Sequence, residues 1–196
     1  MICHIEPFDH IRLRPQWYFK TLFEEKTLDS LPLEMIQYTI DQGSTKITVN
    51  LYVDSFSVEF NSSMSLEVYH DYLGDITQAE AVLVKTTNFP ELWKEGVLES
   101  GLCGSVGLIR INATSKWCSL LTYSNGEKGV FSFKEGKTET RTICGSDEQK
   151  NYTKLTVKPA PTIFPNLTIS PTTLQKKIDE IHKKLHKTAI QLHIKK

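Results

Sequence analysis

The stretch Lys46-Ile47-Thr48-Val49-Asn50-Leu51-Tyr52-Val53 decides the fold class of this chain. Every second residue from Ile47 to Val53 is aliphatic, and the residues between them carry polar atoms. Because side chains along a β-strand point alternately to opposite faces, this period of two predicts a strand with one buried face. The pattern recurs over residues 56–60, so we expect two neighbouring strands of one sheet.

Further strands and helices follow from the same kind of pattern. Asn125-Gly126 predicts a tight hairpin, because both residues tolerate a positive φ. Asp29-Ser30 supplies cap residues for a helix that ends near Gly43, and residues 89–96 predict a shorter one. Composition predicts strands over residues 16–27, 105–111, 116–123, 130–133, 139–143 and 153–157. We therefore expect an α+β fold with a mostly antiparallel β body, one or two short helices packed on it, and a C-terminal amphipathic helix.

The 196 residues divide into three expected units. Residues 1–158 form the β-rich globular domain, and residues 159–173, which are punctuated by prolines, form an extended linker. In residues 174–196 apolar side chains recur at alternating intervals of four and three, which predicts a basic amphipathic helix. The stripe consists of Leu174, Ile178, Ile181, Leu185, Thr188 and Leu192.

Charge is distributed unevenly, although the formal net charge is zero. The C-terminal segment carries seven lysines against Asp179 and Glu180, and the remainder of the chain is acidic. Such asymmetry predicts that the segment contacts an anionic surface: a membrane, a nucleic acid or an acidic face of a second copy. The candidate contact residues are Lys176, Lys177, Lys183, Lys184, Lys187, Lys195 and Lys196.

Several classes of protein are disfavoured. No apolar run is long enough for a membrane span, and residues 1–10 do not have the pattern of a signal peptide. The four cysteines lack the paired spacing of a zinc site, so we expect no metal and no cofactor, and mostly free thiols. A secreted glycoprotein remains an alternative if a leader precedes this sequence, because four asparagines lie in glycosylation sequons. They are Asn61, Asn112, Asn151 and Asn166.

The glycine-rich run Gly101-Leu102-Cys103-Gly104-Ser105-Val106-Gly107 is the sharpest catalytic candidate. It resembles the nucleophile loop of chymotrypsin-like viral cysteine proteases, most closely the main proteases of coronaviruses. The resemblance implies Cys103 as the nucleophile, with His4 or His10 as its base and backbone N–H groups as the oxyanion hole. The other interpretation is a glycine-rich bend that enters a buried strand.

The layout as a whole resembles the matrix proteins of rhabdoviruses, more the plant-infecting type than the animal type. The resemblance rests on the aromatic segment Trp17-Tyr18-Phe19-Lys20 before one helix, on the β body, and on Trp117 in a hairpin. It implies a non-enzymatic viral structural protein that associates with itself. This protein would bridge the viral nucleocapsid or RNA to an anionic membrane, as a peripheral component of the host cytoplasm and the virion.

Overall fold

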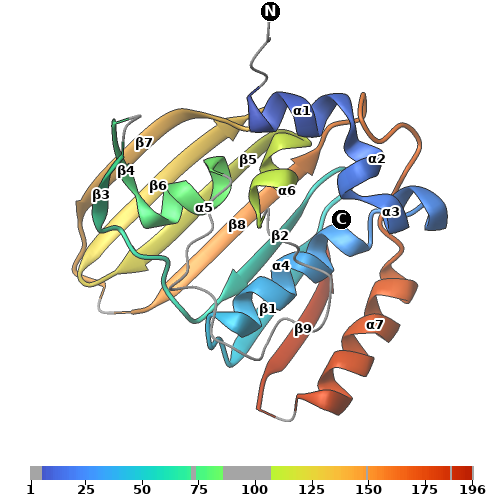
Figure 1. The fold of residues 1–196 in the computed structure, drawn as a ribbon. Coiled ribbons are helices and arrows are strands. Elements are labelled where there is room, and N and C mark those ends of the chain that lie inside the picture. The colour runs from blue at the N-terminus through green and yellow to red at the C-terminus, as the bar shows by residue number, and fades with distance from the viewer. Residues whose placement is uncertain (1–5, 72–73, 86–106, 149, 186, 196) are drawn as a thin grey trace, which may run out of the picture.

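A seven-stranded sheet runs through the molecule in the order β7-β6-β5-β8-β2-β1-β9 (Figure 1). The structure is a computed structural model that describes residues 6–71, 74–85, 107–148, 150–185 and 187–195. The strands of this sheet are β1 (Lys46–Leu51), β2 (Phe56–Phe60), β5 (Ser115–Ser124), β6 (Glu127–Lys134), β7 (Lys137–Gly145), β8 (Tyr152–Pro159) and β9 (Ala189–Ile194). A separate two-stranded sheet pairs β3 (Val68–Asp71) with β4 (Gly74–Thr77). The expected α+β class with a mostly antiparallel sheet is confirmed.

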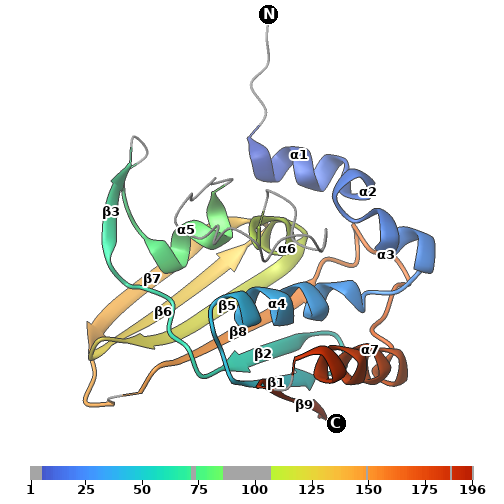
Figure 2. The ribbon, with the colours of Figure 1, turned by 60° about the horizontal axis from the view of Figure 1, so that its bottom comes forward.

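The helices are short and lie on one side of the large sheet (Figure 2). They are α1 (Pro7–Leu13), α2 (Pro15–Tyr18), α3 (Lys20–Glu25), α4 (Ser30–Asp41), α5 (Gln78–Val84), α6 (Ile109–Ala113) and α7 (Pro171–Lys184). Figure 2 shows α4, α5 and α6 above the strands, while the other face of the sheet carries no described helix. The molecule therefore has two layers, with the core between them.

The predicted strand pair and hairpin are both present. Strands β1 and β2 are antiparallel, with Val49 opposite Val58. The β5–β6 hairpin turns at Asn125 and Gly126, whose φ angles are 53° and 77°. All contacts between neighbours in the large sheet are antiparallel except the one between β1 and β9, which is parallel.

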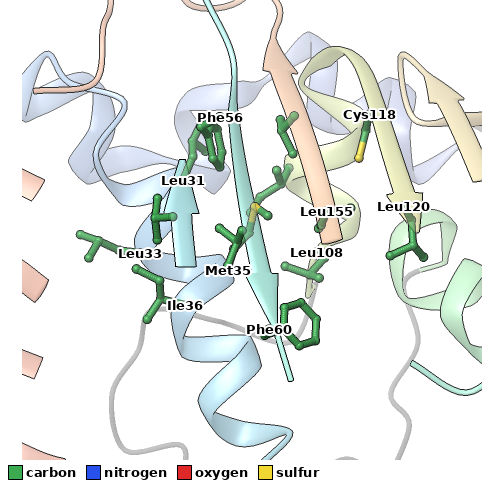
Figure 3. Packing of buried hydrophobic residues seen from close by; sticks show 14 of the residues in the cluster. Leu31, Leu33, Met35, Ile36, Phe56, Phe60, Leu108, Cys118, Leu120 and Leu155 are labelled. Carbon is green, nitrogen blue, oxygen red and sulfur yellow. The ribbon is translucent and has the colours of Figure 1, made fainter. Parts of the chain in front are cut away.

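The core forms where the inward faces of the strands meet α4 and α6 (Figure 3). Phe56, Leu120 and Phe131 of the sheet are fully buried, and so are Leu31 and Ile36 of α4. Figure 3 shows side chains of α4 directed toward those of β2 and β8. Burial of these side chains stabilises the fold by roughly 1.5–3 kcal/mol each relative to exposure.

The N-terminal region differs from the expected strand over residues 16–27. It folds into the three helices α1, α2 and α3. Pro7 and Pro15 each begin a helix, where the missing N–H costs nothing. Phe19 and Leu22 are buried, and the ring of Phe19 packs edge-on against Phe164 at 5.8 Å between centroids. Packing against the loop after β8 therefore overrides the β propensity of the aromatic residues.

The C-terminal segment also differs from the expected single helix. Residues 171–184 form α7, and residues 189–194 then turn back as strand β9 beside β1. Leu174 and Ile178 are completely buried in the same cluster as the sheet, so α7 packs on the body after the proline-containing stretch. The backbone N–H of Ile190 donates to Nε2 of His182 at 2.8 Å, which ties β9 to α7.

The expected strand over residues 105–111 is also replaced by helix. Residues 105 and 106 lie outside the described part, and Ile109–Ala113 form α6. The expected helix over residues 89–96 lies wholly outside the described residues. None of the helices in the described part of the chain is long and apolar enough to cross a membrane.

Candidate functional site: a buried glutamate–arginine pair

The helical layer contains a buried ion pair between α4 and α6. Oε2 of Glu34 lies 2.9 Å from Nη2 of Arg110, and the two side chains are 6% and 10% exposed. The Nη1 group of Arg110 also donates to the carbonyl oxygen of Tyr18 at 2.9 Å. The guanidinium lies over the ring of Phe19, 5.3 Å from its centroid. Charged side chains are seldom buried to this extent without a structural or chemical role.

Burial makes the carboxyl group of Glu34 unusually basic. Removal from water raises the pKa of Glu34 from 4.5 to about 8, although the charge of Arg110 and its hydrogen bond act in the opposite direction. A carboxyl group with a pKa in this range exchanges its proton near neutral pH. This is the property of a general base or acid, which works best when its pKa lies near the operating pH.

This shift predicts a pH dependence of stability that belongs to Glu34. The folded state binds the proton more tightly than the unfolded state, so the associated stabilisation is complete below pH 4.5 and is lost as the pH rises through 8. The steepest loss is about 1.4 kcal/mol per pH unit. Urea unfolding of the wild type and of Glu34→Gln measures it. Between pH 5 and pH 8 we expect the wild type to lose stability relative to Glu34→Gln, as measured by the free energies of unfolding of the two proteins. If the free energies of unfolding of the two proteins changed with pH in the same way, the raised pKa of Glu34 would be contradicted.

Helix α6 is held in place by a second buried polar residue. The side-chain amide of Asn112, which is completely buried, donates to the carbonyl oxygen of Leu83 at 2.9 Å and to that of Gly136 at 3.2 Å. Gly136 has a φ of 92°, and a Cβ there would lie 3.1 Å from Cα of Ala113. A glycine is therefore needed where the β6–β7 turn meets α6. This clamp fixes the helix that presents Arg110 to Glu34.

The glycine-rich run enters the helix that carries Arg110. Gly107, its last residue, has a φ of 62°, and α6 begins two residues later at Ile109. Residues 86–106 lie outside the described part. They connect Lys85, which follows α5 and whose pKa is lowered by burial, to Gly107. A buried guanidinium and a carboxyl group thus lie together beside the helix that the glycine-rich sequence precedes.

This combination suits a phosphorylated ligand. Glycine-rich turns let backbone N–H groups approach phosphate oxygens closely, and guanidinium and ammonium groups offset their charge. Among the described residues no group of three histidine, cysteine or acidic side chains is placed to hold a metal ion. The expectation that the chain uses no metal or cofactor stays a prediction.

Of the three residues that the protease interpretation uses, the structure describes only His10. Cys103 and His4 lie outside the described residues. Nδ1 of His10 is 2.7 Å from the hydroxyl of Tyr18, and its ring packs edge-on against Trp17. His10 thus has an aromatic and phenolic environment in the last turn of α1. Of the other thiols, Cys118 is buried, which raises its pKa, and Cys144 is exposed.

The C-terminal lysines follow α7 and β9 along the edge of the sheet. Lys177 pairs with Glu25 at 3.1 Å. The other described members, Lys176, Lys183, Lys184, Lys187 and Lys195, are exposed, and Lys196 lies outside the described residues. Contact of these lysines with an anionic ligand stays a proposal.

Two of the four sequon asparagines have structural roles. Asn112 is buried as described above, and Oδ1 of Asn61 accepts hydrogen bonds from the backbone N–H groups of Thr45 and Lys46. Glycosylation of Asn112 would require the fold to open. Asn151 and Asn166 are exposed.

Comparison with known proteins decides what kind of fold this is. No protein-family model matches the chain. A solved structure, the 43K ATPase domain of Thermus thermophilus gyrase B in complex with an aminocoumarin, superposes with a TM-score of 0.68. The match covers 90% of this chain and 45% of that chain at 22% sequence identity. The chain shares the fold of the matched part of that structure.

A curated protein sequence leads to the same kind of relative. One subunit of a type 2 topoisomerase of Aquifex aeolicus is 26% identical over 186 residues, which is 90% of this chain and 23% of that protein. The chain therefore spans about a quarter of this relative and less than half of the solved ATPase-domain chain.

These matches overturn the functional expectations drawn from the sequence. The resemblance to rhabdovirus matrix proteins is wrong, because a topoisomerase protein and a gyrase domain each match nearly the whole chain. The viral structural function, the protease and glycoprotein alternatives, and the virion, host-cytoplasm and secreted locations are set aside with it. The expectation of a non-enzymatic protein is also contradicted, since the matched structure is an ATPase domain. The membrane and nucleocapsid partners have no support.

Sequence inspection missed both members of the buried pair. Glu34 stands between Leu33 and Met35 in a helix whose apolar residues cover more than one face, which is a signal of a buried charge. Arg110 was not identified as a site residue because the pattern of residues 105–111 predicts a strand. A glycine-rich run that precedes a helix is a phosphate-binding arrangement in many proteins, whereas the same run before a strand is not.

Proposed function

We propose that this chain is an ATP-binding domain in which Glu34 acts as the base for hydrolysis. The observation that carries the proposal is the position of Glu34, a buried carboxyl group with a pKa of about 8, against the helix that follows the glycine-rich run. The names of the matched proteins support it, since one of them is an ATPase domain.

The chemistry assigns one task to each group. The guanidinium of Arg110, on the helix that follows Gly107, binds the phosphates of ATP, which arrives as its magnesium complex. Arginine can exchange a carboxylate partner for a phosphate, because both present paired oxygens to its planar fork. When Arg110 turns to the phosphates, Glu34 is released from the 2.9 Å contact.

In its ionised form, which becomes populated as the pH approaches 8, Glu34 then accepts a proton from a water molecule. The water oxygen forms a bond to the γ-phosphorus, the bond to the bridging oxygen breaks, and ADP leaves with the electron pair. General-base catalysis of this kind contributes roughly 10²–10⁴-fold to a rate. The proposal is limited to ATP hydrolysis and does not extend to DNA topology, because the chain spans only part of its relatives. Self-association is retained as a proposal, to be tested by sedimentation.

The test measures ATP binding and phosphate release separately. Isothermal titration with Mg-ATP should show binding to the wild type and to Glu34→Gln, while phosphate release by Glu34→Gln should fall by about 10²-fold or more. Glu180→Gln is a matched control, because Glu180 is exposed on α7. Absence of binding at millimolar Mg-ATP would exclude the proposal. Equal hydrolysis by the wild type and Glu34→Gln would exclude the role of Glu34.

A further inference from the structure

The face of the sheet opposite the helices carries a row of ring and aliphatic side chains on its central strand. Along β5 the buried residues Cys118 and Leu120 face the helical layer, so Trp117, Ser119, Leu121 and Tyr123 belong to the other face, where Tyr123 is only 8% exposed. Trp117 is 37% exposed although it is the largest side chain of the strand. We call Trp117, Leu121 and Tyr123 the β5 track.

Each member of the β5 track has a lysine directly across from it on a neighbouring strand. Lys158 of β8 is the register partner of Trp117, and Lys154 of β8 is the partner of Leu121. On the other side, Lys128 of β6 is the partner of Tyr123. Side chains at such positions are about 4.5–5.5 Å apart at Cβ. The same pair thus occurs three times along the strand. In each pair a ring or an aliphatic side chain of the β5 track lies beside a lysine.

The carboxylates of this face only partly neutralise its lysines. Lys154 pairs with Glu59 at 3.0 Å, and Lys158 pairs with Asp54. Lys128 instead lies over the ring of Tyr123, 5.8 Å from its centroid. Lys150 pairs with Glu148 and also lies over this ring. Together with Lys134, which is exposed at the end of β6, these lysines outnumber their carboxylate partners.

We propose that the β5 track binds single-stranded DNA. Bases stack on the exposed ring of Trp117 and on the aliphatic surface of Leu121 and Val130, and the adjacent lysines contact the phosphates. A sheet face of this kind is flat, so it cannot enter a groove of a duplex, whereas unpaired bases can lie on it. From Trp117 to Tyr123 the track is about 20 Å long, at 3.3–3.4 Å per residue. Such a length accommodates two or three bases, as in other sheet-based binding surfaces.

The composition of the track favours a nucleic acid strand over other polyanions. An anionic membrane or an acidic peptide would use the lysines but would gain little from an exposed tryptophan that alternates with them. Rings and phosphates are both present in DNA, and the groups named here do not depend on the 2′-hydroxyl by which proteins recognise RNA. We therefore commit to DNA, with RNA as a comparison in the test.

The test is fluorescence anisotropy of the full chain with labelled oligodeoxythymidylate, oligouridylate and a DNA duplex of equal length. We expect a dissociation constant of about 10⁻⁶–10⁻⁴ M for the single DNA strand, with affinity falling linearly with salt on a double-logarithmic plot. Trp117→Ala should weaken binding by about 5–100-fold, the effect of losing one stacked base. The salt dependence should stay unchanged in this variant.

Two lysine variants separate the sheet face from the C-terminal lysines. Lys128→Gln with Lys134→Gln should reduce the slope of the salt dependence by about 1.4, or 0.7 per contact. Lys183→Gln with Lys184→Gln removes two exposed lysines of α7 and should change neither affinity nor slope. Trp117→Leu keeps part of the apolar area without the ring, so it should also weaken binding, by less than Trp117→Ala, and it guards against an effect on folding.

The proposal is overturned by any of three results. They are tighter binding of duplex or oligouridylate than of single-stranded DNA, unchanged affinity of both Trp117 variants, and a larger loss from the α7 variant than from the β6 variant. The proposed ATP site lies on the other side of the sheet, so Mg-ATP binding should be the same in all these variants. Failure of ATP binding would leave the expected DNA results unchanged.

Discussion

Arg110→Leu is expected to lower the free energy of unfolding by about 3–5 kcal/mol at pH 9, because it leaves the carboxylate of Glu34 buried without its cation. The pair is enclosed by α4, α6 and the segment around Phe19, so water cannot replace the lost partner. At pH 6 the cost should be smaller, since burial favours the protonated form of Glu34. Urea unfolding at both pH values measures the difference.

A double variant distinguishes the ion pair from simple loss of packing. Glu34→Leu together with Arg110→Leu removes both charges, and replacing a buried pair by apolar residues is often neutral or stabilising. We therefore expect the double variant to recover most of the stability that Arg110→Leu loses. Lys177→Leu breaks a surface pair with Glu25 and should cost no more than about 1 kcal/mol. A double variant as unstable as Arg110→Leu would show that the stability loss has another origin.

Phe131→Ala should destabilise the protein by about 3–5 kcal/mol through lost burial and an unfilled cavity. Phe131 is completely buried in β6, and its ring is stacked on that of Phe133 with 6.4 Å between centroids. The site is tightly packed, since a Cβ on Gly129 would lie 2.8 Å from the Phe131 ring and 2.5 Å from Leu66. Thermal or urea unfolding measures the effect.

The neighbouring residue provides the control. Val130 belongs to the opposite face of the same strand and is 40% exposed. Val130→Ala should therefore change the free energy of unfolding by only about 0.5 kcal/mol. Equal losses for Phe131→Ala and Val130→Ala would mean that the assignment of the two faces of β6 is incorrect.

The sheet could be predicted from the sequence because its signals are local. The alternation over residues 46–53 and the Asn125-Gly126 turn each depend on a few adjacent residues. The structure confirms the turn and the strand from Lys46 to Leu51, whereas Val53 lies beyond the strand and is exposed. The helices α1–α3 could not be predicted in this way. Their aromatic residues favour strands when considered alone, and it is contact with the loop around Phe164 that makes the helical arrangement favourable.

The candidate site was hidden for a related reason. Glu34 and Arg110 become neighbours only when α4 and α6 pack in the same layer, and no spacing in the sequence connects them. The C-terminal segment shows the same limit. Its apolar stripe predicts α7, where Leu174 and Ile178 are buried, but the return of the chain as β9 depends on parallel pairing with β1.

That parallel pairing has a consequence during protein synthesis. β1 is paired on one side by β2, which follows it closely, but its other hydrogen-bonding edge is covered only by β9. While the ribosome is still adding the intervening residues, this edge of the nascent chain is exposed to other strands. An uncovered strand edge is a template for intermolecular association, so premature termination before Ala189 would yield a product prone to aggregate.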